Sequence, residues 1–150
     1  MKKALTLLFA AVMLLCMAAC GNDPAADQIA GSYRCTVTEY TQYQKNGQWR
    51  DTSYVYKNDG TVTITKVDDK TVSVSLSSHH AGEATFANAV VTDLNTMANI
   101  SGSGSITLAT TNFTHDARLS GTYSYDRKSL AVSTIVQGVS PKITFSFTNN

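Results

Sequence analysis

The side chains best suited to chemistry in this chain are its thiols and imidazoles. They are Cys16, Cys20, Cys35, His79, His80 and His115. Thiols can be acylated, oxidised or used as nucleophiles, and imidazoles bind zinc together with carboxylates. His79 and His80 lie near Glu83, whereas His115 precedes Asp116 in a distant segment. This spacing matches no established metal motif, and adjacent residues of an extended chain point to opposite sides. We therefore expect solvated histidines and no metal.

The N-terminal segment explains two of the three cysteines. A basic start, Met1–Lys3, precedes an apolar run over residues 4–19 that is shorter than the roughly 20 residues of a membrane-spanning helix. This layout predicts a secretory signal peptide, residues 1–19. The sequence MAAC at 17–20 resembles the lipobox of bacterial lipoproteins, which implies that Cys20 becomes an acylated N-terminus carrying chains such as palmitate. Several acyl chains give stable membrane attachment. Cys16 follows the bulky Leu15 and should leave with the signal peptide.

Two regions follow the predicted signal peptide. Residues 20–28 are polar, include Pro24 and show no apolar periodicity, which predicts a flexible tether. Residues 29–150 are sufficient for one domain with a hydrophobic core. Loss of Lys2 and Lys3 lowers the formal net charge from +1 to −1 (+1 − 2 = −1), and no basic stripe is present. Nucleic acid is therefore not an expected partner.

Cys35 is the cysteine that remains in the domain. It lies in YRCTV (33–37), where strand alternation places it on the same face as Tyr33 and Val37. A free cysteine in such a strand is most often a small buried hydrophobic side chain, and the alternative is a reactive thiol. We expect a buried thiol.

No segment of the domain carries the pattern of an active site. The chain has no Gly-x-Ser-x-Gly elbow, and Asp68-Asp69 is typical of a turn. The GSGS sequence at 102–105 lacks the lysine and the strand–helix context of a phosphate-binding loop. We therefore expect no catalytic residue, no cofactor and no enzymatic activity.

Period-two alternation dominates the domain and predicts its fold class. Strand-like segments cover 33–37, 49–57, 61–67, 71–77, 84–94, 106–109, 118–125, 129–136 and 142–148. Asn46-Gly47 predicts a hairpin, residues 58–60 a further turn, and the SGSGS sequence at 101–105 a flexible segment. Because the connections are hairpin-length, the strands should form an all-β, antiparallel meander that closes into a β-barrel of about 8–10 strands.

The pattern resembles a known family. IAGSYRCTVT (29–38), TVTITKVDDKTVSVSLS (61–77) and the C-terminal LSGTYSYDRKSLAVSTIV and KITFSFT are similar to the calycin-like lipoproteins of Bacteroidetes. The resemblance implies a lipocalin-like barrel behind a lipoprotein signal, anchored in the outer membrane of a Gram-negative bacterium. GSY (31–33) is similar to the Gly-x-Trp start of lipocalins, whose Trp pairs with a basic residue near the last strand. Here only Lys142 could take that role.

The aromatic residues carry two functional hypotheses. Many of them fall in the first two predicted strands: Tyr33, Tyr40, Tyr43, Trp49, Tyr54 and Tyr56. In the first hypothesis, a monomeric barrel binds a small apolar or amphipathic ligand through Tyr33, Trp49, Tyr54 and Tyr123. In the alternative, tyrosines on the outside bind glycans or a partner protein, and strand parity assigns to the outside Tyr40, Tyr43, Tyr54 and Tyr56. Strand propensity alone also favours tyrosine. Exposure of the rings separates these interpretations.

Overall fold

The computed structural model describes residues 24–149, which form one short helix and eight strands. The elements are α2 (Ala25–Ile29), β1 (Gly31–Lys45), β2 (Gln48–Lys66), β3 (Thr71–Ser78), β4 (Gly82–Asp93), β5 (Met97–Leu108), β6 (Thr114–Ser124), β7 (Ser129–Val136) and β8 (Lys142–Thr148). The predicted signal peptide, Cys16, Cys20 and the start of the tether lie outside the described residues. Within residues 24–149, no helix is long and apolar enough to cross a membrane.

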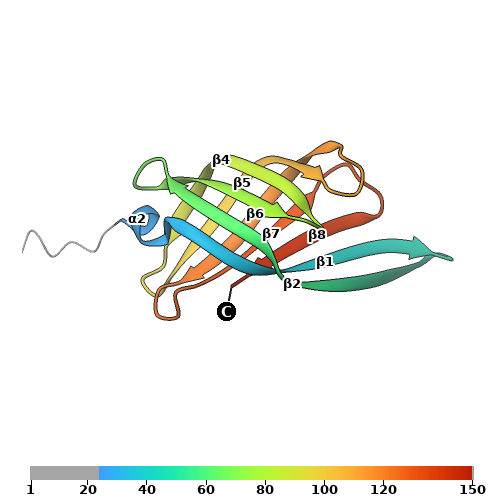
Figure 1. The fold of residues 1–150 in the computed structure, drawn as a ribbon, viewed down its shortest axis with the longest axis horizontal. Helices are drawn as coiled ribbons and strands as arrows, with labels where there is room; N and C mark the ends of the chain where they lie inside the picture. The colour runs from blue at the N-terminus through green and yellow to red at the C-terminus, as the bar shows by residue number, and fades with distance from the viewer. Residues whose placement is uncertain (1–23, 150) are drawn as a thin grey trace, which may run out of the picture.

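The strands form a closed barrel in which each strand pairs antiparallel with the next along the chain, and β8 pairs with β1 (Figure 1). The prediction of an all-β antiparallel meander barrel is therefore confirmed. Short connections explain this order, because a hairpin-length link can only return the chain as an antiparallel neighbour.

The core fills the inside of the barrel. Alternation places one face of each strand inwards, as in β3, where Val72, Val74 and Leu76 are buried. The largest fully buried hydrophobic side chains are Phe86, Phe147, Ile29, Ile100, Ile106, Leu130, Val37, Val62, Val72, Val74 and Val132. A cavity that could hold even a water molecule would leave accessible surface on the side chains around it. These side chains have almost none, so the middle of the barrel is packed.

The outer face of the barrel is rich in hydroxyl groups. Ser75 and Ser77 of β3 are exposed, as are Thr61, Thr63 and Thr65 of β2. An apolar interior with a polar outer face is the reverse of the pattern of membrane-spanning barrels, whose lipid-facing side chains are apolar.

Helix α2 closes one end of the barrel (Figure 1). Its Ala25, Ala26 and Ile29 side chains are buried. Lys66 Nζ lies 2.6 Å from an Asp27 carboxylate oxygen, which ties the helix to β2. The expectation of a flexible tether over residues 20–28 is therefore wrong from Ala25 onwards. Five residues are too few to show helical periodicity in the sequence. The helix is stabilised by burial against the barrel and not by intrinsic helix propensity.

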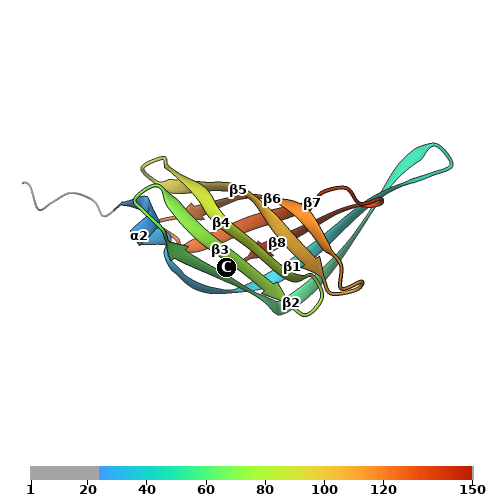
Figure 2. The ribbon, with the colours of Figure 1, turned by 90° about the horizontal axis from the view of Figure 1, so that it is seen from above.

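A long hairpin projects from the other end of the barrel. β1 pairs with β8 only over Thr36–Gln42, and β2 pairs with β3 only over Gly60–Lys66. Beyond these limits the two strands pair only with each other, around the turn at Asn46-Gly47. We call residues 40–59 the arm, which comprises this stretch and the last three β1 residues that pair with β8. Figures 1 and 2 show its tip standing clear of the barrel, opposite α2.

The predicted turn at residues 58–60 is instead an irregularity inside β2. Cys35 pairs with Gly60 and Val37 with Tyr56, so β2 has two more residues than β1 between these pairs. Asn58 has a positive φ of 54°. A Cβ on Gly60 would lie 2.8 Å from a ring carbon of Phe147, which explains the glycine. The sequence therefore makes a bulge at the base of the arm and not a second hairpin.

Cys35 confirms the expectation of a buried thiol, with 1% of its surface exposed. Burial raises its pKa to about 11, so the thiol stays protonated and unreactive at neutral pH. We expect Cys35→Ser to lower the free energy of unfolding by about 2 kcal/mol, because it buries a hydroxyl in an apolar site. Urea denaturation of the two proteins measures the difference.

The matched control removes a buried hydroxyl group instead of adding one. The buried hydroxyl of Thr134 has no hydrogen-bond partner among residues 24–149, so Thr134→Val should leave stability unchanged or raise it. Equal stability of Cys35→Ser and the wild type would contradict the assignment of Cys35 to the core.

Candidate functional site: the arm

The three histidines lie in two segments of the described structure. His79 and His80 occupy the β3–β4 turn, and His115 lies near the start of β6. Among the described residues 24–149, no group of three or more His, Cys, Asp or Glu side chains is placed to hold a metal ion.

His80 of the β3–β4 turn contacts the residues at the base of the arm. Its Nδ1 lies 3.1 Å from an Asp59 carboxylate oxygen, and its ring stacks on Tyr56 with a centroid distance of 3.9 Å. The Ser78 hydroxyl donates a hydrogen bond to Asp59 and accepts one from the backbone N–H of Ala81. Burial by itself would raise the pKa of Asp59. The hydrogen bonds from Ser78 and His80 have the opposite and larger combined effect, so the pKa lies below its ordinary value. The arm is thus attached to the β3–β4 turn as well as to β8.

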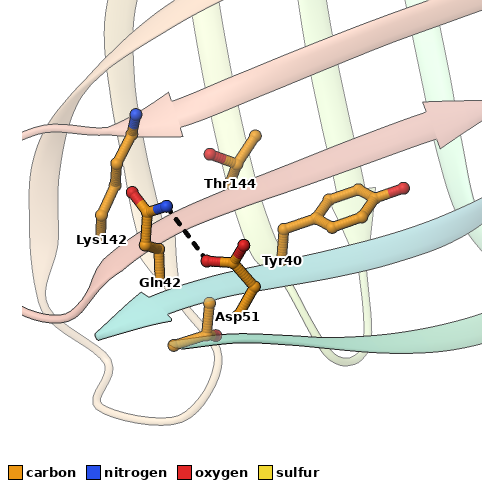
Figure 3. A pocket seen from close by; sticks show the side chains of 6 residues that line it. Tyr40, Gln42, Asp51, Lys142 and Thr144 are labelled. Carbon is orange, nitrogen blue, oxygen red and sulfur yellow. Dashed lines mark hydrogen bonds between the residues drawn. The ribbon is translucent and has the colours of Figure 1, made fainter. Parts of the chain in front are cut away.

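A shallow hollow lies on the outer face of the arm where it leaves the barrel (Figure 3). Its volume is about 220 Å³, and it is lined by Tyr40, Thr41, Gln42, Asp51, Lys142 and Thr144. The Gln42 side-chain amide donates a hydrogen bond of 3.0 Å to Asp51 (Figure 3). The Tyr40 ring is half exposed beside this pair.

Strand register brings these residues together. Gln42 is directly opposite Asp51 on one side and Lys142 on the other, and Tyr40 is opposite Thr144. Directly opposite residues of antiparallel strands share a face. The hollow therefore combines an aromatic ring, an amide, a carboxylate and an ammonium group from β1, β2 and β8.

The exposed apolar side chains of the arm divide between its two faces. Trp49 and Val55 share the outer face with Tyr40, and they are 66% and 59% exposed. Tyr43 and Tyr54 lie on the opposite face, which continues the inside of the barrel. Tyr54 is nevertheless 57% exposed, because it lies beyond the barrel end.

The four aromatic residues predicted to bind a ligand lie in two separate places. Tyr33 and Tyr123 meet at the α2 end with a centroid distance of 5.8 Å in an edge-to-face arrangement. The Tyr33 hydroxyl donates a hydrogen bond of 2.7 Å to the Ile29 carbonyl. Trp49 and Tyr54 lie on the arm at the other end. The barrel therefore does not assemble these rings around one ligand, and the space between them is filled by the core.

The lipocalin pairing of the first aromatic residue with a late basic residue is also absent from the described structure. Lys142 lies opposite Gln42 at the base of the arm, whereas Tyr33 pairs with Val62 towards the α2 end. Tyr33 contacts Tyr123 and the Ile29 carbonyl in place of a cation.

Sequence reasoning missed the polar residues of the hollow. One signal was present, because a two-residue turn at Asn46-Gly47 sets the register that places Gln42 opposite Asp51. No local signal places Lys142 or Thr144 beside them, because that contact depends on closure of the barrel by β8.

The fold matches a known structure. A crystal structure of a Bacteroides fragilis protein, provisionally named an outer membrane protein, superposes with a TM-score of 0.63 at 20% sequence identity. The match covers 87% of this chain but 54% of the other, so this chain spans about half the length of that protein. The likeness shows the fold alone. No protein-family model matches the sequence, and no curated protein does.

Proposed function

We propose that this chain is an envelope lipoprotein that binds glycans through the outer face of its arm. The packed barrel acts as a support, and the hollow beside Tyr40 acts as the recognition site. The observation that carries this proposal is the half-exposed Tyr40 ring next to the hydrogen-bonded Gln42–Asp51 pair and Lys142. The proposed activity is binding without catalysis or a cofactor.

The chemistry of the hollow suits a sugar ring. A pyranose has an apolar C–H face, which can stack on an aromatic ring, and a rim of hydroxyl groups. The Gln42 amide and the Asp51 carboxylate can exchange hydrogen bonds with neighbouring hydroxyls, and Lys142 adds a donor. A volume of about 220 Å³ is below the range of sites for drug-sized ligands. The hollow therefore suits one sugar residue of a longer chain.

The position of the arm supports a role away from the membrane. We propose that acylated Cys20 anchors the chain in the outer membrane, consistent with the name of the structural neighbour. Cys20 precedes α2 closely in the sequence, and the arm lies at the opposite end of the barrel (Figure 1). The anchor would thus hold the α2 end towards the lipid and extend the arm away from it.

The packed interior weighs against a small apolar ligand inside the barrel. Phe86, Ile106 and Leu130 have at most 1% of their surface exposed, and helix α2 covers one opening. A protein partner is the other class that exposed aromatic residues can bind. The polar lining of the hollow and its small volume favour the glycan.

A glycan array tests the proposal with the full-length protein in mild detergent. We expect Tyr40→Ala to weaken retention of the bound glycan at least tenfold, about 1.4 kcal/mol, because it removes the stacking ring. Phe113→Ala is the matched control, since Phe113 is 69% exposed but lies in the β5–β6 turn. Equal losses in the two variants, or no retained glycan in the wild type, would refute glycan binding at this hollow.

A further inference from the structure

The arm leaves one strand edge open. Residues Gln48–Tyr56 of β2 pair with β1 on one side, and no strand among residues 24–149 pairs with them on the other. An open edge presents backbone N–H and C=O groups that can pair with another strand. Natural proteins protect such edges with proline, and the two prolines of this chain, Pro24 and Pro141, lie elsewhere. Figure 2 shows this part of the arm extending away from the barrel.

We propose that a second copy of this chain pairs with this edge. The two β2 strands run antiparallel about a two-fold axis at Thr52, and the two arms form a continuous four-stranded sheet. This pairing departs from the expectation of a monomer, and it does not depend on glycan binding.

Side-chain complementarity selects the axis at Thr52. Trp49 and Val55 lie three positions to either side of Thr52, so each Trp49 faces the Val55 of the second copy. Arg50 and Tyr54 lie two positions to either side and face each other in the same way. Aromatic residues opposite β-branched residues, and cations over aromatic rings, are favourable pairs. The axis also falls at the middle of the regular edge, Gln48–Tyr56.

A two-fold axis at a neighbouring residue would create less favourable side-chain pairs. An axis at Asp51 places the two Asp51 carboxylates against each other, and like charges directly opposite are destabilising. An axis at Ser53 places each Asp51 against a Val55. An axis at Tyr54 places each Trp49 against an Asp59, in the irregular part of β2.

Pairing also removes a weakness of the isolated arm. A two-stranded hairpin is at best marginally stable by itself in water, whereas a sheet of three or more strands with an apolar face can be stable. Trp49, Tyr54 and Val55 are exposed in the single chain, and the pairing covers part of each. Because opposite residues share a face, the two Tyr40 hollows would lie on the same side of the joined sheet.

Cysteine cross-linking tests the register directly. At the axis, the two Thr52 Cα atoms would lie roughly 4.5–5.5 Å apart, which a disulfide can span. The two Tyr54 positions would be offset by four residues, or roughly 13 Å along the strand. We expect Thr52→Cys in the full-length membrane protein to form a covalent dimer when diamide takes up the two thiol hydrogens, and Tyr54→Cys to remain largely monomeric. Cys35 is buried and should not compete.

The result would overturn the proposal if Thr52→Cys stayed monomeric, linked to a different protein, or linked no better than Tyr54→Cys. A second measurement uses the unlinked protein in detergent and determines its dimerisation constant by sedimentation. Val55→Lys should weaken dimerisation at least tenfold. Val90→Lys is the control, because Val90 is an exposed valine of β4. A monomeric wild type at the highest soluble concentration would also reject self-pairing.

Discussion

Replacing Cys20 with alanine should release the protein from the membrane fraction completely while the barrel still folds. In the proposed lipoprotein, the acyl chains on Cys20 provide all of the membrane attachment, because the described barrel has a hydroxyl-rich outer face. Among the described residues, burial begins with Ala25 of α2, which follows Cys20 in the sequence. Metabolic labelling with palmitate should show loss of the acyl chains, membrane fractionation should show the release, and thermal melting of the released variant should show the folded barrel.

Cys16→Ala is the matched control, since Cys16 belongs to the predicted signal peptide. This variant should keep its palmitate label, its membrane location and its melting temperature. Label retained in Cys20→Ala would exclude Cys20 as the site of acylation. A Cys20→Ala protein that failed to melt cooperatively would show that the N-terminal residues contribute to the core.

Much of the barrel could be predicted because local pattern and tertiary structure agree. Val72, Val74 and Leu76 alternate with serines in a predicted strand, and all three are buried inside the barrel. Asn46 and Gly47 have positive φ angles of 53° and 73° and form the predicted hairpin turn. Where each local preference agrees with the global fold, sequence reasoning succeeds.

The predictions that were wrong concern segments whose local sequence is compatible with two different structures. Asn58-Asp59-Gly60 suits a turn, but it also suits a bulge, because Asn58 can adopt the positive φ that occurs in several turn types and in some bulges. Only the pairing of β2 with β1 on one side and β3 on the other distinguishes them. Helix α2 is missed for a related reason, because its stability comes from burial of Ile29 under the barrel.

The candidate site was predictable only in part. The tyrosines of the first two strands were identified, but their assignment to the outside was wrong for Tyr43, Tyr54 and Tyr56. The register leaves only Tyr40 of this group on the outer face. The exposure of these tyrosines depends on how far β1 and β2 extend beyond β8 and β3, which no local pattern specifies. The contribution of Lys142 likewise requires the ends of the chain to meet.

The SGSGS sequence at 101–105 provides the sharpest contrast between a local interpretation and the structure. It was predicted to be flexible, but it lies within β5, where it pairs with β6 throughout and with β4 at Ser101 and Ser105. A Cβ on Gly104 would overlap the carbonyl oxygen of Thr85 on β4 and lie 2.8 Å from a ring carbon of the buried Phe86. Glycine is therefore present at position 104 because two backbones approach closely there.

Gly104→Ala should consequently lower the free energy of unfolding by about 3 kcal/mol, since the added methyl group must push β4 and β5 apart. Gly102→Ala is the matched control in the same strand. Its Cβ would lie 3.1 Å from Ala89, a tight contact that small shifts can relieve, and the loss should be about 1 kcal/mol. Urea denaturation of the soluble Cys20→Ala background measures both. A flexible segment predicts the opposite sign, because replacing glycine with alanine there stabilises a protein by about 0.4–1 kcal/mol through the unfolded chain. A stabilised Gly104→Ala variant would thus show that β4 and β5 do not approach as closely as the structure places them.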